Sequence, residues 1–218
     1  MPKWALLALT AAAHAAVIRG VVVEHQTGHA LSQALVVCTP VAGTAGTVQS
    51  ARTNNSGAFE FSTLPGGAYL LSASRRGFAP VQYGQKQYHG AGLPIILEEA
   101  SATFINLRLP RLGSITGIVA DENDVGVSAG NSPVAGAPVF LESYDPASRR
   151  RLTDLRTART DMRGQYHFYG VAPGNYRLLS SFEFQNPDAP ALDAANARIV
   201  KAEEARDLSQ DLDLYVIR

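Results

Sequence analysis

The residues best suited to hold a ligand lie in one stretch, residues 78–90, where aromatic side chains alternate with amides. The apolar face of a sugar ring packs on an aromatic ring, while amide groups hydrogen-bond to its hydroxyls. The predicted ligand contacts are Phe78, Tyr83, Gln85 and Tyr88. The alternative is that Phe78 and Tyr83 only fasten the loop to the fold. Tyrosine rings exposed side by side would favour binding, whereas burial of both would favour a structural role.

The sequence offers little for catalysis. It contains no Gly-x-Ser-x-Gly turn for a serine nucleophile and no glycine-rich phosphate-binding motif. Cys38 is the single cysteine and lies in an apolar run, which is typical of a small core residue. The sequence therefore predicts a protein that is not an enzyme and has no catalytic residues.

Three groups of residues are candidates for metal ligands. His25 and His29 have the spacing of a zinc pair, but they lie in a predicted turn with no third ligand in view. The loop tyrosines with His89 could hold iron, yet a second histidine is not placed. The acidic stretch 121–124 could hold calcium, but the glutamate that completes a calcium loop is missing. We predict no metal and no cofactor.

Charge and the N-terminus limit the partners. Nineteen basic residues balance nineteen acidic ones, so nucleic acid and anionic lipid are not expected partners. Residues 1–15 combine Lys3, an apolar run too short to span a bilayer, and small residues near position 15. This pattern predicts a secretory signal peptide, with a buried N-terminal helix as the alternative. We expect no membrane span after its removal.

The rest of the chain contains one pattern twice. Residues 53–69 and 160–176 both read as a polar turn, a glycine, two aromatics separated by one residue, and a Gly-x-Tyr turn. The duplication predicts two domains, at residues 16–110 and 111–218. A linker near residues 110–113 is too short for free tumbling and predicts a semi-rigid pair.

Short apolar runs between turn residues predict seven strands in each domain, arranged as an antiparallel sandwich. They are expected at 17–23, 34–40, 47–53, 58–62, 68–75, 93–98 and 103–109, then at 114–120, 137–144, 152–160, 165–169, 175–183, 196–201 and 208–216. Beyond the leader, only residues 193–206 suggest a helix. Long connections are expected at 77–92, 121–136 and 183–196, where binding usually occurs.

The paired signatures predict specific local structure. Phe59 and Phe61 should face the core, as should their counterparts in the second copy, because alternate strand residues share one face. Gly57 should adopt a positive φ that ends a hairpin turn. The tyrosine of each Gly-x-Tyr turn, Tyr69 and Tyr176, should bury its ring and return its hydroxyl to backbone.

These residues resemble the carboxypeptidase regulatory-like domain, which has a transthyretin-like (prealbumin-like, starch-binding-like) β-sandwich of immunoglobulin-like architecture. The first copy departs from the pattern in having Gly66 where the turn proline usually stands, and Pro65 lies one residue earlier. The lysine needed for the isopeptide bond of related collagen-adhesin repeats is absent from both first strands. The residues that carry the resemblance are Gly20, Ala34, Val36, Thr53, Gly57, Phe59, Phe61, Gly67 and Tyr69, then Gly117, Ala137, Val139, Thr160, Gly164, Tyr166, Phe168, Pro173, Gly174 and Tyr176.

The resemblance implies an exported bacterial accessory module, secreted, periplasmic or at the cell envelope. We expect a non-catalytic binding or scaffolding protein whose partner is a polysaccharide or an envelope protein. Carbohydrate is the ligand class that the fold relatives favour. The alternative is a structural spacer or a protein-interaction stalk.

Overall fold

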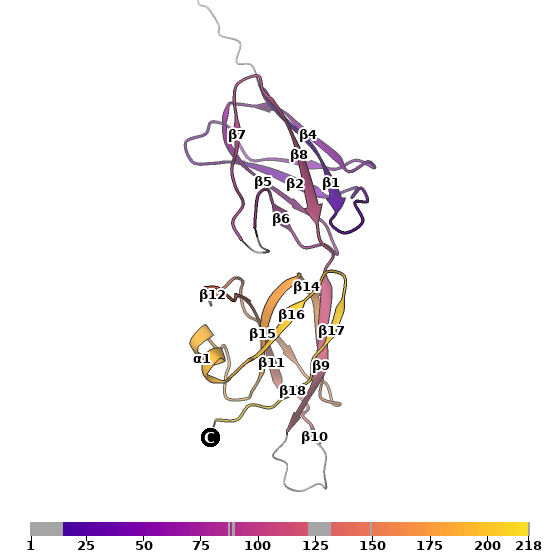
Figure 1. Cartoon of the computed structure of the whole chain (residues 1–218), viewed down its shortest axis with the longest axis vertical. Coiled ribbons are helices and arrows are strands. Elements are labelled where there is room, and N and C mark those ends of the chain that lie inside the picture. The colour runs from indigo at the N-terminus through magenta and orange to yellow at the C-terminus, as the bar shows by residue number, and fades with distance from the viewer. Residues whose placement is uncertain (1–14, 87, 89, 122–131, 149, 218) are drawn as a thin grey trace, which may run out of the picture.

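The computed structural model describes residues 15–86, 88, 90–121, 132–148 and 150–217. The predicted signal peptide lies almost entirely outside the described residues, as do His89 and residues 122–124 of the acidic stretch. Figure 1 shows two β-rich units placed end to end along the longest axis. In the described part of the chain, no helix has the length and apolar character needed to cross a membrane.

The first unit packs two sheets face to face. One sheet has the order β4-β1-β8, and the other is built on β3-β2-β5, with β6 and β7 both paired to β5. The strands are β1 (Ala16–Glu24), β2 (Leu35–Pro40), β3 (Gln49–Arg52), β4 (Ala58–Leu64), β5 (Gly67–Ser74), β6 (Val81–Gln82), β7 (Ile95–Leu97) and β8 (Ala102–Leu109).

The second unit repeats this topology. One sheet has β9 at its centre, flanked by β14 and by β17 and β18, with β10 pairing its end; the other runs β13-β11-β15-β16, with β12 also on β11. The elements are β9 (Gly113–Asp121), β10 (Ser132–Pro133), β11 (Pro138–Asp145), β12 (Arg150–Arg151), β13 (Arg156–Arg159), β14 (Gln165–Val171), β15 (Gly174–Ser180), α1 (Ala189–Ala194), β16 (Arg198–Ala202), β17 (Asp207–Ser209) and β18 (Leu212–Asp213).

The all-β sandwich is confirmed, with two corrections of detail. The first and last strands of each unit run parallel, as β1 with β8 and β9 with β17 and β18, so the sheets are mixed and not purely antiparallel. The structure also divides the described residues into more strands than seven per domain, because β6, β10, β12 and β18 are two-residue strands that no periodicity could reveal.

The helix predicted at residues 193–206 is wrong. The helix α1 lies earlier, and residues 198–202 form β16. Asp188 caps α1 by accepting a hydrogen bond from the Ala191 N–H at 2.9 Å, and Pro190 stands in the first turn. Both features favour a helix that starts here. Pairing with β15 then takes residues 198–202 into a strand, which shows tertiary context overriding local propensity.

The predictions for the repeated signature are confirmed. Phe59 and Phe61 are buried with ring centroids 6.0 Å apart, and Tyr166 and Phe168 repeat this packing at 6.0 Å. Gly57 has φ 74° and its second-copy counterpart has φ 72°. Each unit therefore closes a separate hydrophobic core beneath its aromatic pair.

The two corner tyrosines also behave as predicted. The rings of Tyr69 and Tyr176 are buried, and each hydroxyl donates to the carbonyl four residues earlier, Pro65 at 2.9 Å and Ala172 at 2.8 Å. These bonds fasten each turn to its own core.

Cys38 is fully buried on β2, as predicted for a core residue. Burial raises the pKa of its thiol from the ordinary 9.0 to about 11. The reactive thiolate is therefore suppressed at neutral pH.

The segment that joins the two units is held by backbone hydrogen bonds to the first unit. The Ala79 N–H donates to the Pro110 carbonyl at 2.8 Å, and the Leu112 N–H donates to the Gly77 carbonyl at 3.0 Å. After β8 the chain thus pairs with residues 77–79, in the connection between β5 and β6, before it starts β9. This agrees with a semi-rigid pair of units, since backbone pairing limits rotation of the linker.

Candidate functional site

The loop after β5 is fastened to the sheet by its own polar groups. The Tyr83 N–H donates to the Leu71 carbonyl at 2.8 Å, which continues the pairing of β6 with β5. The Gln82 N–H donates to Gln85 Oε1 at 2.9 Å, and the Gly92 N–H donates to Gln82 Oε1 at 2.9 Å. These bonds give the loop a defined shape on a rigid scaffold.

A pocket of about 340 Å³ opens beside this loop. Its walls are residues 81–86 and Tyr88 of the loop, residues 106–108 of β8, and His25 just after β1. The structure therefore brings together three of the four predicted ligand contacts, Tyr83, Gln85 and Tyr88. A pocket of this size accepts a small ligand such as a sugar ring.

Tyr83 and Tyr88 are neither fully exposed, as the binding hypothesis expected, nor fully buried, as the structural alternative expected. Both are half-buried, and Tyr83 also packs against the hydrophobic core. Burial, and next the Glu204 carboxylate, raise the pKa of the Tyr88 hydroxyl. The Tyr88 phenol is therefore neutral at physiological pH, and part of each tyrosine side chain is accessible in the same pocket.

Phe78 lies apart from this pocket and is buried at 8% exposure. Two guanidinium groups lie over its ring, that of Arg75 at 5.5 Å and that of Arg111 at 5.2 Å from the centroid. A ring covered in this way packs and takes part in cation–π contacts, so it offers no face to a sugar. Phe78 fits the structural alternative and not the predicted ligand contact.

Sequence reasoning missed the far wall of the pocket, formed by His25, Asn106 and Arg108. The last two are exposed residues two apart on β8, so they share the face that points away from the core. Their polarity was readable from the sequence. Their position beside the loop was not, because it depends on the pairing of β8 with β1 and of β6 with β5.

His25 also contacts the second unit, on an edge of the pocket. Its Nδ1 lies 2.8 Å from Glu204 Oε2, and the other oxygen of Glu204 accepts from the Arg111 N–H at 3.0 Å. Arg111 in turn forms an ion pair with Glu24, which Thr27 also contacts at 2.7 Å. These hydrogen bonds hold the pKa of Glu24 below its ordinary value, the Arg111 bond above all.

The matching loop of the second unit is closed by a buried ion network. Glu142 is fully buried, with Arg151 Nε 2.6 Å from Oε1 and Arg177 Nε 2.6 Å from Oε2. Arg177 also pairs with Asp193 of α1, and Arg151 donates to the Pro187 carbonyl at 2.7 Å. The network fastens loop 181–197 over the sheet.

The two phenylalanines of this loop also differ from each other in their surroundings. Phe184 stacks on Tyr215 with centroids 6.1 Å apart, whereas Phe182 is 55% exposed.

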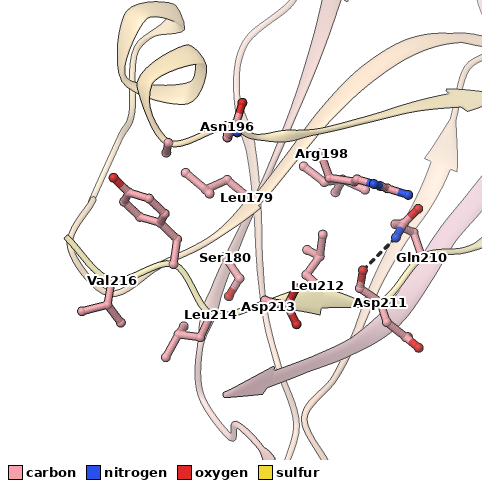
Figure 2. A pocket seen from close by; sticks show the side chains of 13 residues that line it. Leu179, Ser180, Asn196, Arg198, Gln210, Asp211, Leu212, Asp213, Leu214 and Val216 are labelled. Atoms are coloured by element: carbon pink, nitrogen blue, oxygen red, sulfur yellow. Dashed lines mark hydrogen bonds between the residues drawn. The ribbon is translucent and has the colours of Figure 1, made fainter. Parts of the chain in front are cut away.

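A second hollow, of about 860 Å³, lies between the two sheets of the second unit. Figure 2 shows Arg198, Gln210 and Asp211 at one end and Val216 at the other. The Asp211 carboxylate accepts from the Ile118 N–H at 2.9 Å, and the Gln210 amide donates to the Asp211 carbonyl at 2.8 Å. The Asp211 carboxylate and the Gln210 amide therefore stabilise the fold. Tyr215 is the single aromatic residue among the described residues that line this hollow.

The candidate zinc pair is not assembled. Residues 25–29 form the turn after β1, closed by the Glu24 N–H donating to the His29 carbonyl at 2.8 Å. No group of three metal-ligating side chains occurs among the residues that the structure describes.

Residues 17–98 match the sequence profile of the carboxypeptidase regulatory-like domain. No curated protein matches the chain significantly. Solved structures share the fold at low identity. The minor pilin of Streptococcus agalactiae overlays with a TM-score of 0.53 at 15% identity, covering 93% of this chain and 97% of the pilin.

Two further structures are more distant. A streptococcal ancillary pilin has a TM-score of 0.49 at 13% identity, with 93% of this chain and 63% of the pilin covered. A proposed carbohydrate-binding protein of Bacteroides uniformis has a TM-score of 0.33 at 13% identity, with coverages of 76% and 88%. The profile match and the topology of β1 to β8 agree. Residues 17–98 are therefore similar in sequence and topology to a carboxypeptidase regulatory-like domain, within a chain built of β-sandwiches.

Proposed function

We propose that the protein is a non-catalytic binding module that holds carbohydrate in the pocket beside residues 81–86 and Tyr88. The observation that carries this proposal is the placement of Tyr83 and Tyr88, half-buried, with Gln85 in one pocket of about 340 Å³. Aromatic faces beside amide groups suit the alternating apolar and hydroxyl surfaces of a sugar.

We further propose the setting in which this module works. Residues 1–15 are a signal peptide, and residues 16–110 and 111–218 are the two domains of an exported protein, secreted or held at the bacterial cell envelope. The fold shared with a minor pilin supports a location outside the cytoplasm, and the separate hydrophobic cores support the division into two domains.

A structural spacer or protein-interaction stalk is the second candidate. The observation that favours it is the junction, where Glu204 contacts both His25 and Arg111 and the linker pairs with residues 77–79. Such contacts hold two domains in one orientation, as a spacer requires.

A glycan array and a polysaccharide screen separate the two candidates. The parent protein is compared with Y83A/Y88A and with Y169A, a control that removes a 70% exposed tyrosine outside the pocket. The binding proposal expects saturable binding that is lost in Y83A/Y88A and retained in Y169A. If all three proteins are folded by circular dichroism and bind no glycan, the stalk is the better account.

A further inference from the structure

We propose that the ligand of this pocket is an acidic polysaccharide whose sugars carry carboxylates, that is, a uronic-acid polymer. The proposal rests on the carbohydrate function proposed above and names the substrate class of the same site. It depends on the charge of the pocket walls and on which polar groups the fold leaves unused.

The pocket walls are cationic although the chain is neutral. Lys86 and Arg108 both line the pocket, both are exposed, and neither forms an ion pair with any residue that the structure describes. None of the described residues that line the pocket is an aspartate or a glutamate. Nineteen basic and nineteen acidic residues balance over the whole chain, so this excess is local.

The nearest acidic groups are already engaged. Glu204 accepts from the Arg111 N–H and contacts His25, while Glu24 is held by Arg111 and Thr27. The Arg111 guanidinium balances the charge of Glu24, while the field of Glu204 reaches Tyr88. Two cations without an ion pair to any described residue, Lys86 and Arg108, outnumber that single carboxylate, so a net positive charge remains for a bound anion.

Three of the free groups in the pocket are donors, from Gln85, Lys86 and Arg108. Gln85 Oε1 is occupied by the Gln82 N–H, which leaves the Gln85 amide nitrogen free to donate. Lys86 and Arg108 can only donate, and the guanidinium fork matches a carboxylate with two parallel bonds. A neutral sugar would need a more even set of donors and acceptors, whereas a carboxylate only accepts.

Asn106 lines the same pocket, and its amide oxygen can accept from a sugar hydroxyl. His25 lies at the edge of the pocket, where its Nδ1 is 2.8 Å from Glu204 Oε2. Donors for a carboxylate, an acceptor for a hydroxyl and two tyrosines together describe a sugar acid better than a bare anion.

The test compares one polymer in two charge states by affinity electrophoresis of the full chain. Polygalacturonic acid carries the carboxylates, and the same polymer with its carboxylates methyl-esterified lacks the charge. We expect the acid form to bind at least about tenfold more tightly, since one charge-assisted contact is worth about that factor. Dextran sulfate serves as an unrelated polyanion.

Charge variants locate the effect. K86Q and R108Q should each weaken binding of the acid form by about tenfold and leave binding of the ester unchanged. R198Q/K201Q removes two exposed positive charges from β16 and should leave both polymers unaffected. All four changed side chains are exposed, so folding is not at risk.

The outcomes separate the two proposals. Equal binding of both polymers that is lost in Y83A/Y88A overturns the uronate proposal and keeps the sugar pocket. Binding to dextran sulfate as strong as to polygalacturonate, weakened by R198Q/K201Q as much as by R108Q, overturns it as non-specific charge attraction. If neither these polymers nor the glycan screen gives binding, both proposals fail.

Discussion

Replacing Arg177 by leucine should expose how much the buried ion network contributes to the second unit. The repeat register identifies the substitution, because Tyr69 and Tyr176 are equivalent and the next residue is Leu70 in the first unit. In the first unit Leu70 pairs across the strands with Thr39, and in the second unit Arg177 pairs with Glu142 at the equivalent position. The first unit thus shows an uncharged alternative for the same cross-strand pair.

The expected cost follows from the burial of the partners. Glu142 is fully buried and the Arg177 side chain is 3% exposed, so R177L leaves a buried carboxylate with one of its two partners removed. Losing one partner of a buried pair costs about 3–5 kcal/mol. Arg151 still neutralises Glu142 at 2.6 Å, which places the expected loss of unfolding free energy near the lower limit, about 3 kcal/mol.

The matched double variant E142T/R177L separates charge from shape. It restores the pair found in the first unit, and exchange of a buried ion pair for apolar residues is often close to neutral. We expect its stability to lie within about 1.5 kcal/mol of the parent. R163L makes the same change at an exposed arginine and should alter stability by less than about 0.5 kcal/mol.

Urea unfolding followed by far-UV circular dichroism measures these differences, with each transition fitted separately because the two units need not unfold together. A loss below about 1 kcal/mol for R177L would refute the reasoning, since water would then reach Glu142. A double variant as unstable as R177L would show that the loss comes from loop packing and not from an uncompensated charge.

Three further predictions concern the shared scaffold. T160V should destabilise by about 1–3 kcal/mol, because the Thr160 hydroxyl accepts from the Ala137 N–H at 2.8 Å, and T160S should retain most of the stability in the same urea assay. G117A should cost about 1–3 kcal/mol or rearrange the unit, since its Cβ would overlap the Gln210 carbonyl oxygen; an unchanged midpoint would contradict this close approach. Stability should fall as pH rises from about 9 to about 11, because Cys38 stays protonated in the folded state and loses its proton earlier when unfolded; C38A should flatten that part of the pH profile, and an unaltered profile would count against it.

Much of the candidate site could be predicted from side-chain chemistry along one loop. The aromatic and amide side chains predicted Tyr83, Gln85 and Tyr88, and these three residues share one pocket. Phe78 has the same chemical character and sits in the same loop, yet its ring is buried beneath Arg75 and Arg111. Composition alone cannot tell an aromatic that binds from one that packs, because both use the same apolar face.

Short-range patterns in the sequence are sufficient to specify the sandwich cores and their repetition. Alternation of Phe59 and Phe61, a positive φ at Gly57 and the hydroxyl bond of Tyr69 all follow from rules that span a few residues. Such local rules hold in both copies because each copy carries the same short signature.

Contacts between residues far apart in the sequence, by contrast, decide which residues form the far wall of the pocket and which ion network holds loop 181–197 in the second unit. His25 and Glu204 meet over 179 positions, and Arg177 reaches Glu142 over 35. These pairings depend on which strands become neighbours and on how the chain crosses between sheets. The free energy of such contacts comes from packing and desolvation in the assembled fold, and therefore leaves no periodic trace in the sequence.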